Sequence, residues 1–259
     1  MYTDRTPRVV AARHLTRRQG RDRAGRFLAE GAQAVREALA FATVHELFVT
    51  PDAAARHPDL VRSAADTGVR ISPITDRAAA SLSETVTPQG IVAVCDLLDV
   101  PAREALAGEP KLVAVLVGIS DPGNAGTVIR VADAAGADAV ILAGDTVDPH
   151  NGKCVRASTG SLFHLPITRS REIPAALAAC RAAGLRLVGA DGHARDILDG
   201  GRLGEPTAWV FGSEAHGLPD WVRAGLDHCV RVPIYGRAES LNLATAAAVC
   251  LYASATAQH

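Results

Sequence analysis

The sequence predicts an α/β protein of two parts, a small amino-terminal α/β domain and a larger domain built on a parallel sheet. Apolar runs of strand length alternate with helical stretches along the 259 residues, which is the pattern of α/β units. The runs after residue 110 are continuously apolar, as in strands buried on both faces of a parallel sheet. Between the two parts lies a segment bounded by Pro101 and Pro110.

The first part, residues 1–98, begins with a basic arm. Residues 1–26 contain eight arginines and only two acidic residues, Asp4 and Asp22. Such an arm is either a solvated, frayed chain end or a segment that contacts phosphate. Arginine favours phosphate over a purely solvated role, because its planar guanidinium can pair with two phosphate oxygens at once.

Helices and strands alternate through the rest of this part. The segment 27–40 places Phe27, Leu28, Ala32, Val35 and Leu39 at helical spacing. The following elements are predicted as strand 44–50, helix 53–68, strand 69–74, a short helix within 75–85 and strand 89–97. Residues 99–110, rich in Ala, Glu and Gly, form the predicted linker.

The second part, residues 111–259, repeats the alternation with longer strands. The predicted strands are 111–119, 138–144, 186–191 and 207–213, and the predicted helices are 125–136, 171–183 and 217–225. The final stretch, "LNLATAAAVCLYASAT", predicts a helix without charged residues. A helix so poor in charge is either buried in its own domain or packed against a second copy of the chain.

Composition excludes several classes of protein. The net charge of -1, taken alone, argues against a polyanion-binding protein, and no apolar run approaches the roughly 18 residues of a membrane span. The lack of such a run and of a secretory-signal core leads us to expect a soluble protein of the cytoplasm. The five cysteines are odd in number, far apart and without a C-x-x-C pair, so we expect buried, reduced thiols. The nine histidines form no metal-binding pattern, and no protein-bound metal is expected.

Ligands of open parallel sheets collect beyond the carboxyl ends of the strands, and a glycine-rich stretch follows the first strand of the second part. This stretch, "GISDPGNAGTVIRVADAAGA", contains neither the dinucleotide fingerprint nor the Walker phosphate loop. Asn124 is placed to cap the following helix. Arg130 is either a solvated helix residue or a functional one, and its spacing alone does not decide.

Two further polar stretches follow strands. In "VFGSEAHGLP", Gly212 would let a ligand approach the backbone, and Glu214 is expected near the start of the next helix. His216 in the same stretch is either a general base or an ordinary loop residue. In "VPIYGRAESLNLATAAAV", Ser240 is expected to cap the final helix, with Asn242 beside it. The absence of a G-x-S-x-G elbow argues against a hydrolase.

Taken in order, "NAGTVIR", "FGSEAHGL" and "VPIYGRAESLNLA" resemble the three motifs of the SpoU (TrmH-type) RNA 2'-O-ribose methyltransferases of the SPOUT superfamily. "FLAEGAQAVREAL" and "SETVTPQGIVAV" are similar to the family's amino-terminal RNA substrate-binding domain. The resemblance implies a carboxyl-terminal parallel-sheet domain tied in a deep trefoil knot that binds S-adenosylmethionine. It also implies a homodimer in which one subunit's arginine lies near the other's cofactor.

The resemblance also assigns residues. Arg130 would hold a phosphate and stabilise negative charge developing on oxygen, since arginine stays protonated. Asn124 and Ser240 would orient Arg130 and the ribose, while Glu214 and Asn242 would fix the knot loops. The implied cofactor contacts are Gly212, Val232, Ile234 and Leu241. The implied RNA contacts are Arg17, Arg18, Arg21, Arg23, Arg26 and Arg156.

The function implied is S-adenosylmethionine-dependent methylation of a ribose 2'-hydroxyl in structured RNA, ribosomal or transfer. The alternative is a non-catalytic RNA-binding or ribosome-associated protein of the same fold, and the intact motif residues argue against it. A nicotinamide-dependent oxidoreductase fits the coarse α/β pattern but lacks the glycine fingerprint.

Overall fold

The structure is a computed structural model in which residues 1–198 and 203–259 are described. The chain forms two compact units. The first unit comprises Met1–Leu98 and Asp148–His164, and the second comprises Asp99–Val147 and Leu165–His259. The segment 148–164, which lies within the predicted methyltransferase domain, therefore packs with the amino-terminal residues.

The first unit is built on a mixed sheet of four strands among the described residues, in the order β1-β4-β2-β3. Strand β4 runs antiparallel to β1 and β2, and β3 is parallel to β2. The strands are β1 (Arg26–Glu30), β2 (Val44–Val49), β3 (Arg70–Pro73) and β4 (Ile91–Asp96). The helices are α1 (Pro7–Arg13), η1 (His14–Thr16), α2 (Arg18–Ala24), α3 (Ala32–Phe41), α4 (Pro51–Arg56), α5 (Pro58–Asp66), α6 (Asp76–Ser81), α9 (Gly152–Ser158) and η2 (Ser161–Phe163).

Alternate residues of β1 supply two separate cores, because neighbouring side chains of a strand point to opposite faces. Leu28 packs in a cluster with residues of α1, η1 and α6. Phe27, on the other face, stacks on Phe163 with 6.0 Å between ring centroids and lies 4.7 Å from the ring of His150. The segment 148–164 thus covers one face of the sheet of the first unit.

The helix predicted across residues 27–40 is wrong at its start. Residues 26–30 form strand β1, paired with β4, and α3 begins only at Ala32. Gly31 separates the two elements with a φ of 96°, a conformation that favours glycine. Pairing with β4 and burial on both faces outweigh the local helical spacing of Phe27 and Leu28.

The single helix predicted over 53–68 is also wrong. Two helices, α4 and α5, meet at His57, and Pro58 is the first residue of α5. Proline lacks the amide hydrogen that a continuous helix would need there, but it is well suited to the first turn of a new one.

The basic arm is folded rather than frayed. It forms α1, η1 and α2, and Val9, Ala12 and Leu15 enter the core. Arg21 is buried: its Nε donates to Asp148 Oδ2 over 2.7 Å and its Nη1 donates to the carbonyls of Leu15 and Thr16. This ion pair fastens the arm to the segment 148–164.

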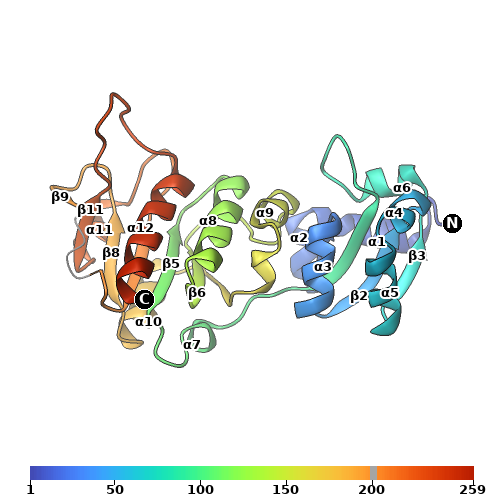
Figure 1. Ribbon diagram of the computed structural model, residues 1–259, viewed down its shortest axis with the longest axis horizontal. Helices are drawn as coiled ribbons and strands as arrows, with labels where there is room; N and C mark the ends of the chain where they lie inside the picture. Colours follow the sequence, from blue (N-terminus) through green and yellow to red (C-terminus); the bar gives the residue numbers. More distant parts are fainter. Residues whose placement is uncertain (199–202) are drawn as a thin grey trace. The chain divides into compact units, whose positions relative to one another are not determined.

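The second unit carries a parallel sheet of seven strands among the described residues, in the order β7-β6-β5-β10-β8-β11-β9 (Figure 1). The strands are β5 (Leu112–Val117), β6 (Ala139–Ala143), β7 (Ile167–Ser170), β8 (Arg186–Ala190), β9 (Asp196–Ile197), β10 (Thr207–Phe211) and β11 (His228–Arg231). The helices are α7 (Ala102–Ala105), α8 (Pro122–Ala134), α10 (Ile173–Ala182), α11 (Asp220–Ala224) and α12 (Leu243–Gln258). The prediction of a parallel α/β sheet is confirmed.

Helices cover both faces of this sheet. Alternate residues of β5 and β10, including Val115 and Val210, pack against α10 and α11. Helices α8 and α12 lie side by side (Figure 1), and the hydroxyl of Tyr252 donates to the carbonyl of Ala134. The predicted linker contains α7, and the backbone amide of Val100 donates to the carbonyl of Ile167, the first residue of β7. In the described parts of the chain, no helix is long and apolar enough to cross a membrane.

Candidate functional site

The first motif begins at the amino terminus of α8, beyond the carboxyl end of β5. Asp121, not Asn124, is the capping residue: its Oδ1 accepts from the amide of Asn124 over 2.8 Å. The expected cap is therefore wrong, because the Asp-Pro step starts the helix three residues earlier. Asn124 is left with its side-chain amide available for partners from other motifs.

The second motif reaches Asn124 through Glu214. Asn124 Nδ2 donates to Glu214 Oε1 over 3.0 Å, and the amides of Ser120 and Asp121 donate to the same carboxylate over 3.4 Å each. Burial raises the pKa of Glu214, but these hydrogen bonds together lower it by more than burial raises it. Its pKa therefore lies below the ordinary value. Glu214 is therefore ionised at neutral pH. It lies in a loop and not at a helix start, since α11 begins at Asp220.

The third motif joins through Asn242. Its Nδ2 donates to Asn124 Oδ1 over 3.0 Å, while its Oδ1 accepts from the amides of Ala244 and Thr245. Asn242 is thus the capping residue of α12 in place of the expected Ser240. Ser240 is exposed and makes no hydrogen bond with any residue that the structure describes.

One hydrogen-bond chain therefore connects the three motifs. Asn124 lies in the middle, donating to Glu214 and accepting from Asn242. A side-chain amide can both donate and accept, whereas an ionised carboxylate only accepts and a charged amine only donates. Glu214 and Asn242, which follow Asn124 by 90 and 118 positions in the chain, both contact its side chain.

Arg130 lies on the same helix but on another face. It is exposed, and it lies six positions after Asn124, which is about 9 Å along the helix axis and about 240° around it. The residues at the centre of the hydrogen-bond chain and the predicted phosphate-holding arginine therefore point in different directions.

Of the predicted cofactor residues, Val232, Ile234 and Leu241 lie on the segment between β11 and α12. Val232 is half-buried, whereas Ile234 is 39% exposed and Leu241 is 37% exposed. Gly212 is different: a Cβ atom there would lie 2.2 Å from the carbonyl carbon of Gly217. The chain's own turn, and not a ligand, occupies the space that Gly212 leaves.

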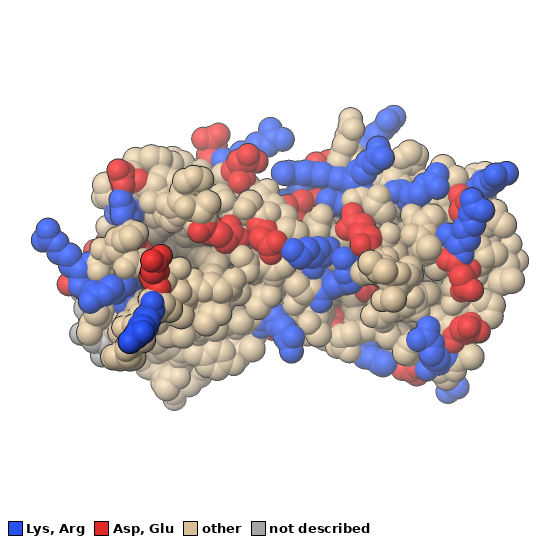
Figure 2. All heavy atoms as spheres, turned by 90° about the horizontal axis from the view of Figure 1, so that it is seen from above, with Lys and Arg blue, Asp and Glu red and all other residues tan. Residues whose placement is uncertain are grey.

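The predicted RNA-binding arginines differ in exposure. Arg17, Arg18, Arg23 and Arg26 are exposed, and Arg156 is half-buried with Nη1 3.1 Å from Glu30 Oε2. Arg21 is 2% exposed, so the expectation that it contacts RNA is wrong: its charge is neutralised inside the first unit by Asp148. Figure 2 shows basic and acidic side chains interspersed over much of the face drawn.

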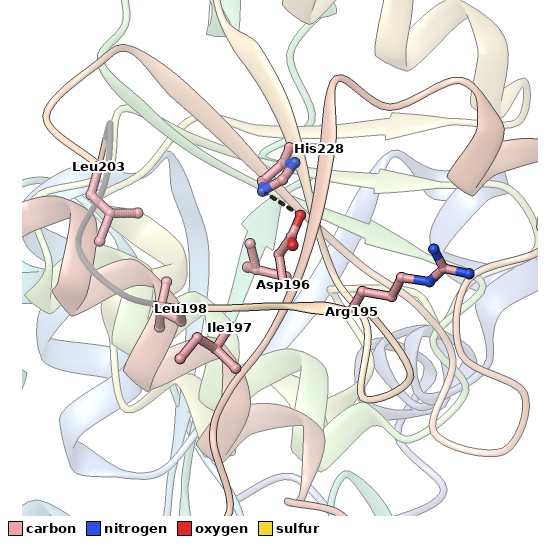
Figure 3. A pocket seen from close by; sticks show the side chains of 7 residues that line it. Arg195, Asp196, Ile197, Leu198, Leu203 and His228 are labelled. Atoms are coloured by element: carbon pink, nitrogen blue, oxygen red, sulfur yellow. Dashed lines mark ion pairs between the residues drawn. The ribbon is translucent and has the colours of Figure 1, made fainter.

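A cavity of about 430 Å³ lies elsewhere, beside β9 and β11 (Figure 3). In it the side chains of His228 and Asp196 point toward each other, with Nε2 3.4 Å from Oδ2. None of the predicted site residues lines this cavity. Among the residues described, no group of three or more His, Cys, Asp or Glu side chains is arranged to hold a metal ion.

Sequence reasoning missed Ser120 and Asp121. Both contribute to the site, Ser120 by donating its amide and hydroxyl to Glu214 and Asp121 by starting α8. An aspartate directly before a proline is a recognised helix-start signal, so Asp121 could have been found from the sequence. Ser120 follows a strand without a distinguishing pattern.

Comparison with known proteins matches residues 111–252 to the SpoU rRNA Methylase family and residues 6–93 to the MRM3-like substrate binding domain. The chain is 35% identical to the 23S rRNA (guanosine(2553)-2'-O)-methyltransferase RlmP of Bacillus subtilis, over 92% of each chain. An AdoMet-bound rRNA methyltransferase of Sinorhizobium meliloti superposes with a TM-score of 0.83 at 30% identity, covering 96% of this chain and 94% of that one. The SpoU methyltransferase AviRb of Streptomyces viridochromogenes, in complex with AdoMet, gives 0.83 at 31% identity, covering 97% and 98%.

Proposed function

The chain belongs to the SpoU rRNA Methylase family, and from that premise we propose which of its residues carry the reaction. The protein is an S-adenosylmethionine-dependent enzyme that methylates a ribose 2'-hydroxyl of ribosomal RNA. The observation that carries the placement of the active site is the hydrogen-bond chain from Glu214 through Asn124 to Asn242. It ties the three loops that the family motifs occupy.

The loop between β11 and α12 fits the cofactor. Ile234 and Leu241 expose apolar side chains suited to the flat face of adenine, and main-chain groups at Val232 and Gly212 would meet its polar edge. S-adenosylmethionine supplies a methyl group on a positively charged sulfur, which makes the methyl carbon electrophilic. The protein mainly has to position the ribose hydroxyl in line with that carbon.

The remaining roles follow from charge and geometry. The ionised Glu214 acts as a fixed hydrogen-bond acceptor that holds the Asn124 amide and the start of α8. Arg130 stays protonated, so it holds the phosphate next to the target ribose and stabilises negative charge that develops on the 2'-oxygen as its proton leaves. Ser240, exposed beside Asn242, is placed to contact the ribose.

The direction of Arg130 supports a homodimer. Because Arg130 points away from Asn124 on α8, it would serve the site of a second copy while Asn124 serves its own. Helix α12, which packs beside α8, carries no charged residue and exposes Val249 and Tyr252, as an interface helix would.

Mixing inactive subunits tests this arrangement. Arg130→Ala and Asn124→Ala proteins, each expected to be strongly impaired alone, should recover part of the activity when subunits exchange, because one of the two sites in a mixed dimer is intact. Native mass spectrometry verifies that subunits have exchanged. If mixed dimers form but no activity is recovered, Arg130 serves its own subunit.

Three further features complete the proposal. The loops after β10 and β11 form the trefoil knot, which a crystal structure tracing residues 199–259 would test.

Five arginines hold RNA phosphates, namely Arg17, Arg18, Arg23, Arg26 and Arg156. Removing these charges should therefore lower the salt dependence of RNA binding. The five cysteines are unpaired, as suits the cytoplasm, and fractionation of cells would test that location.

The catalytic role of Arg130 is tested by labelled methyl transfer to ribosomal RNA from cells that lack the gene. Arg130→Ala is expected to lower kcat by about a hundredfold or more while the unfolding temperature and cofactor affinity stay unchanged, since the side chain is exposed. Arg130→Lys should recover only a part, because lysine cannot pair with two phosphate oxygens. Wild-type rates in Arg130→Ala would refute the role.

A further inference from the structure

The first unit presents an aromatic side chain that its core does not use. Of the five phenylalanines, Phe27, Phe48, Phe163 and Phe211 are between 0% and 8% exposed, whereas Phe41 is 61% exposed. A phenylalanine excluded from the core of a chain with few aromatic residues is an informative exception. It lies at the last residue of α3.

Neighbouring residues hold the Phe41 ring in one orientation. It packs edge to face on the imidazole of His164, with ring centroids 4.9 Å apart and an angle of 73° between the rings. His164 Nε2 lies 3.2 Å from Glu37 Oε2, one turn earlier on α3. Gly160, with a φ of 102°, lets this segment approach α3, since a Cβ there would lie 2.4 Å from Glu37 Cγ. The ring is therefore ordered before any partner binds.

Two basic side chains, those of Arg26 and His45, lie at the end of the sheet where β1 and β2 begin, which is also where α3 ends. Arg26, at the start of β1, has Nε 3.6 Å from Asp96 Oδ1, and His45 Nε2 lies 2.6 Å from the same oxygen. The Arg26 side chain is 45% exposed. The oriented ring of Phe41 and the exposed guanidinium of Arg26, which is paired with Asp96 through Nε, both lie at this end of the sheet. Together they match a ligand that combines flat aromatic groups with negative charge.

We propose that Phe41 and His164 form a stacking platform for an unpaired base of the RNA substrate, with Arg26 meeting a flanking phosphate. The inference rests on the proposed function, because that function makes RNA the substrate. Splayed bases of single-stranded RNA stack on phenylalanine and histidine rings, and every base offers such a face. The platform therefore contributes to holding the RNA rather than to the methyl-transfer step.

Fluorescence anisotropy of a short, labelled single-stranded RNA of mixed sequence tests the platform in the full-length protein. Phe41→Leu keeps an apolar side chain but has no aromatic face, and it is expected to weaken binding about tenfold. Phe41→Trp should bind at least as tightly as the wild type. Trp221→Leu is the matched control, since Trp221 is 55% exposed but lies on α11 in the other unit, and it should leave binding unchanged.

The outcomes separate the platform from a packing role and from the proposed function. Wild-type affinity in Phe41→Leu would overturn the platform, and so would equal weakening in Phe41→Leu and Phe41→Trp with lowered unfolding temperatures. If wild-type protein transfers methyl groups to ribosomal RNA while all Phe41 variants bind equally, the platform alone fails. If wild-type protein transfers none, the proposed function fails, and the anisotropy series still decides whether Phe41 stacks on RNA.

Discussion

At the scale of single residues, Asn242 combines two tasks that different atoms perform. Its Oδ1 caps α12 by accepting from Ala244 and Thr245, and its Nδ2 donates to Asn124. Aspartate at this position keeps the acceptor and loses the donor. The two tasks can therefore be separated by the choice of substitution.

We expect Asn242→Asp to unfold at the wild-type temperature yet to lose about tenfold in methyl-transfer rate, the effect of one hydrogen bond of about 1.4 kcal/mol. Asn242→Ala should lose the same rate and about 1 kcal/mol of stability in addition, because the cap is lost as well. Thermal unfolding and steady-state kinetics on both variants check this. Equal kinetics in Asn242→Asp and the wild type would show that the bond to Asn124 is not used.

The structure gives Gly212 a different role from the one that the sequence suggested. A glycine after an apolar strand suggested close approach of a ligand, but the space is taken by the backbone of Gly217 and Leu218. Gly212→Ala is therefore expected to impair folding of the loop that carries Glu214, seen as a lowered unfolding temperature even without cofactor. An unchanged unfolding temperature with weakened cofactor binding would favour the ligand explanation instead.

At the scale of elements, the sequence predicted the parallel sheet of the second unit well, because its strands are continuously apolar and flanked by helix periodicity. It failed where tertiary pairing decides, as at residues 27–28, which join β4 instead of extending α3. Asn124, Glu214 and Asn242 could be singled out from motifs, but the hydrogen bonds that join them could not be predicted. No local sequence pattern indicates that two residues about a hundred positions further along the chain both form hydrogen bonds with the side-chain amide of Asn124.

A buried hydrogen bond links helix α12 to strand β10 of the sheet. Trp209 Nε1 donates to Ser254 Oγ over 2.9 Å, and both side chains are fully buried. Ser254→Ala should lower the free energy of unfolding by about 1–3 kcal/mol, because the indole hydrogen is left without a partner. Chemical denaturation measures this, with the exposed Thr256→Ala on the same helix as a control. Equal losses in the two variants would refute the special role of Ser254.

At the scale of the whole molecule, the pair Arg21 and Asp148 joins parts of the first unit that are 127 residues apart in the chain. Burial raises the pKa of Asp148, but hydrogen bonds from His150 and the charge of Arg21 together lower it by more than burial raises it. Its pKa therefore lies well below the ordinary value. A carboxyl whose pKa is lowered by folding stabilises the folded state above its unfolded pKa. That stability is lost as pH falls below about 4.

Asp148→Asn is expected to lower the free energy of unfolding at pH 7 by about 3–5 kcal/mol, since the Arg21 charge stays buried without its counter-ion. The difference between variant and wild type should shrink as pH falls below about 4. Denaturant unfolding at a series of pH values measures both effects. A difference that stays constant down to acid pH would contradict the assigned charge of Asp148.

The central claim is that this molecule moves a methyl group from S-adenosylmethionine to a ribose 2'-hydroxyl of ribosomal RNA. Alkaline hydrolysis tests it most directly, because cleavage at a nucleotide requires its free 2'-hydroxyl. Ribosomal RNA from cells lacking the gene, incubated with the protein and labelled cofactor, should yield its label in an alkali-resistant dinucleotide. The Arg130→Ala protein should form this product about a hundredfold more slowly or slower still. Label recovered in single nucleotides would place the methyl group on a base, and no label with the wild-type protein would contradict the assignment altogether.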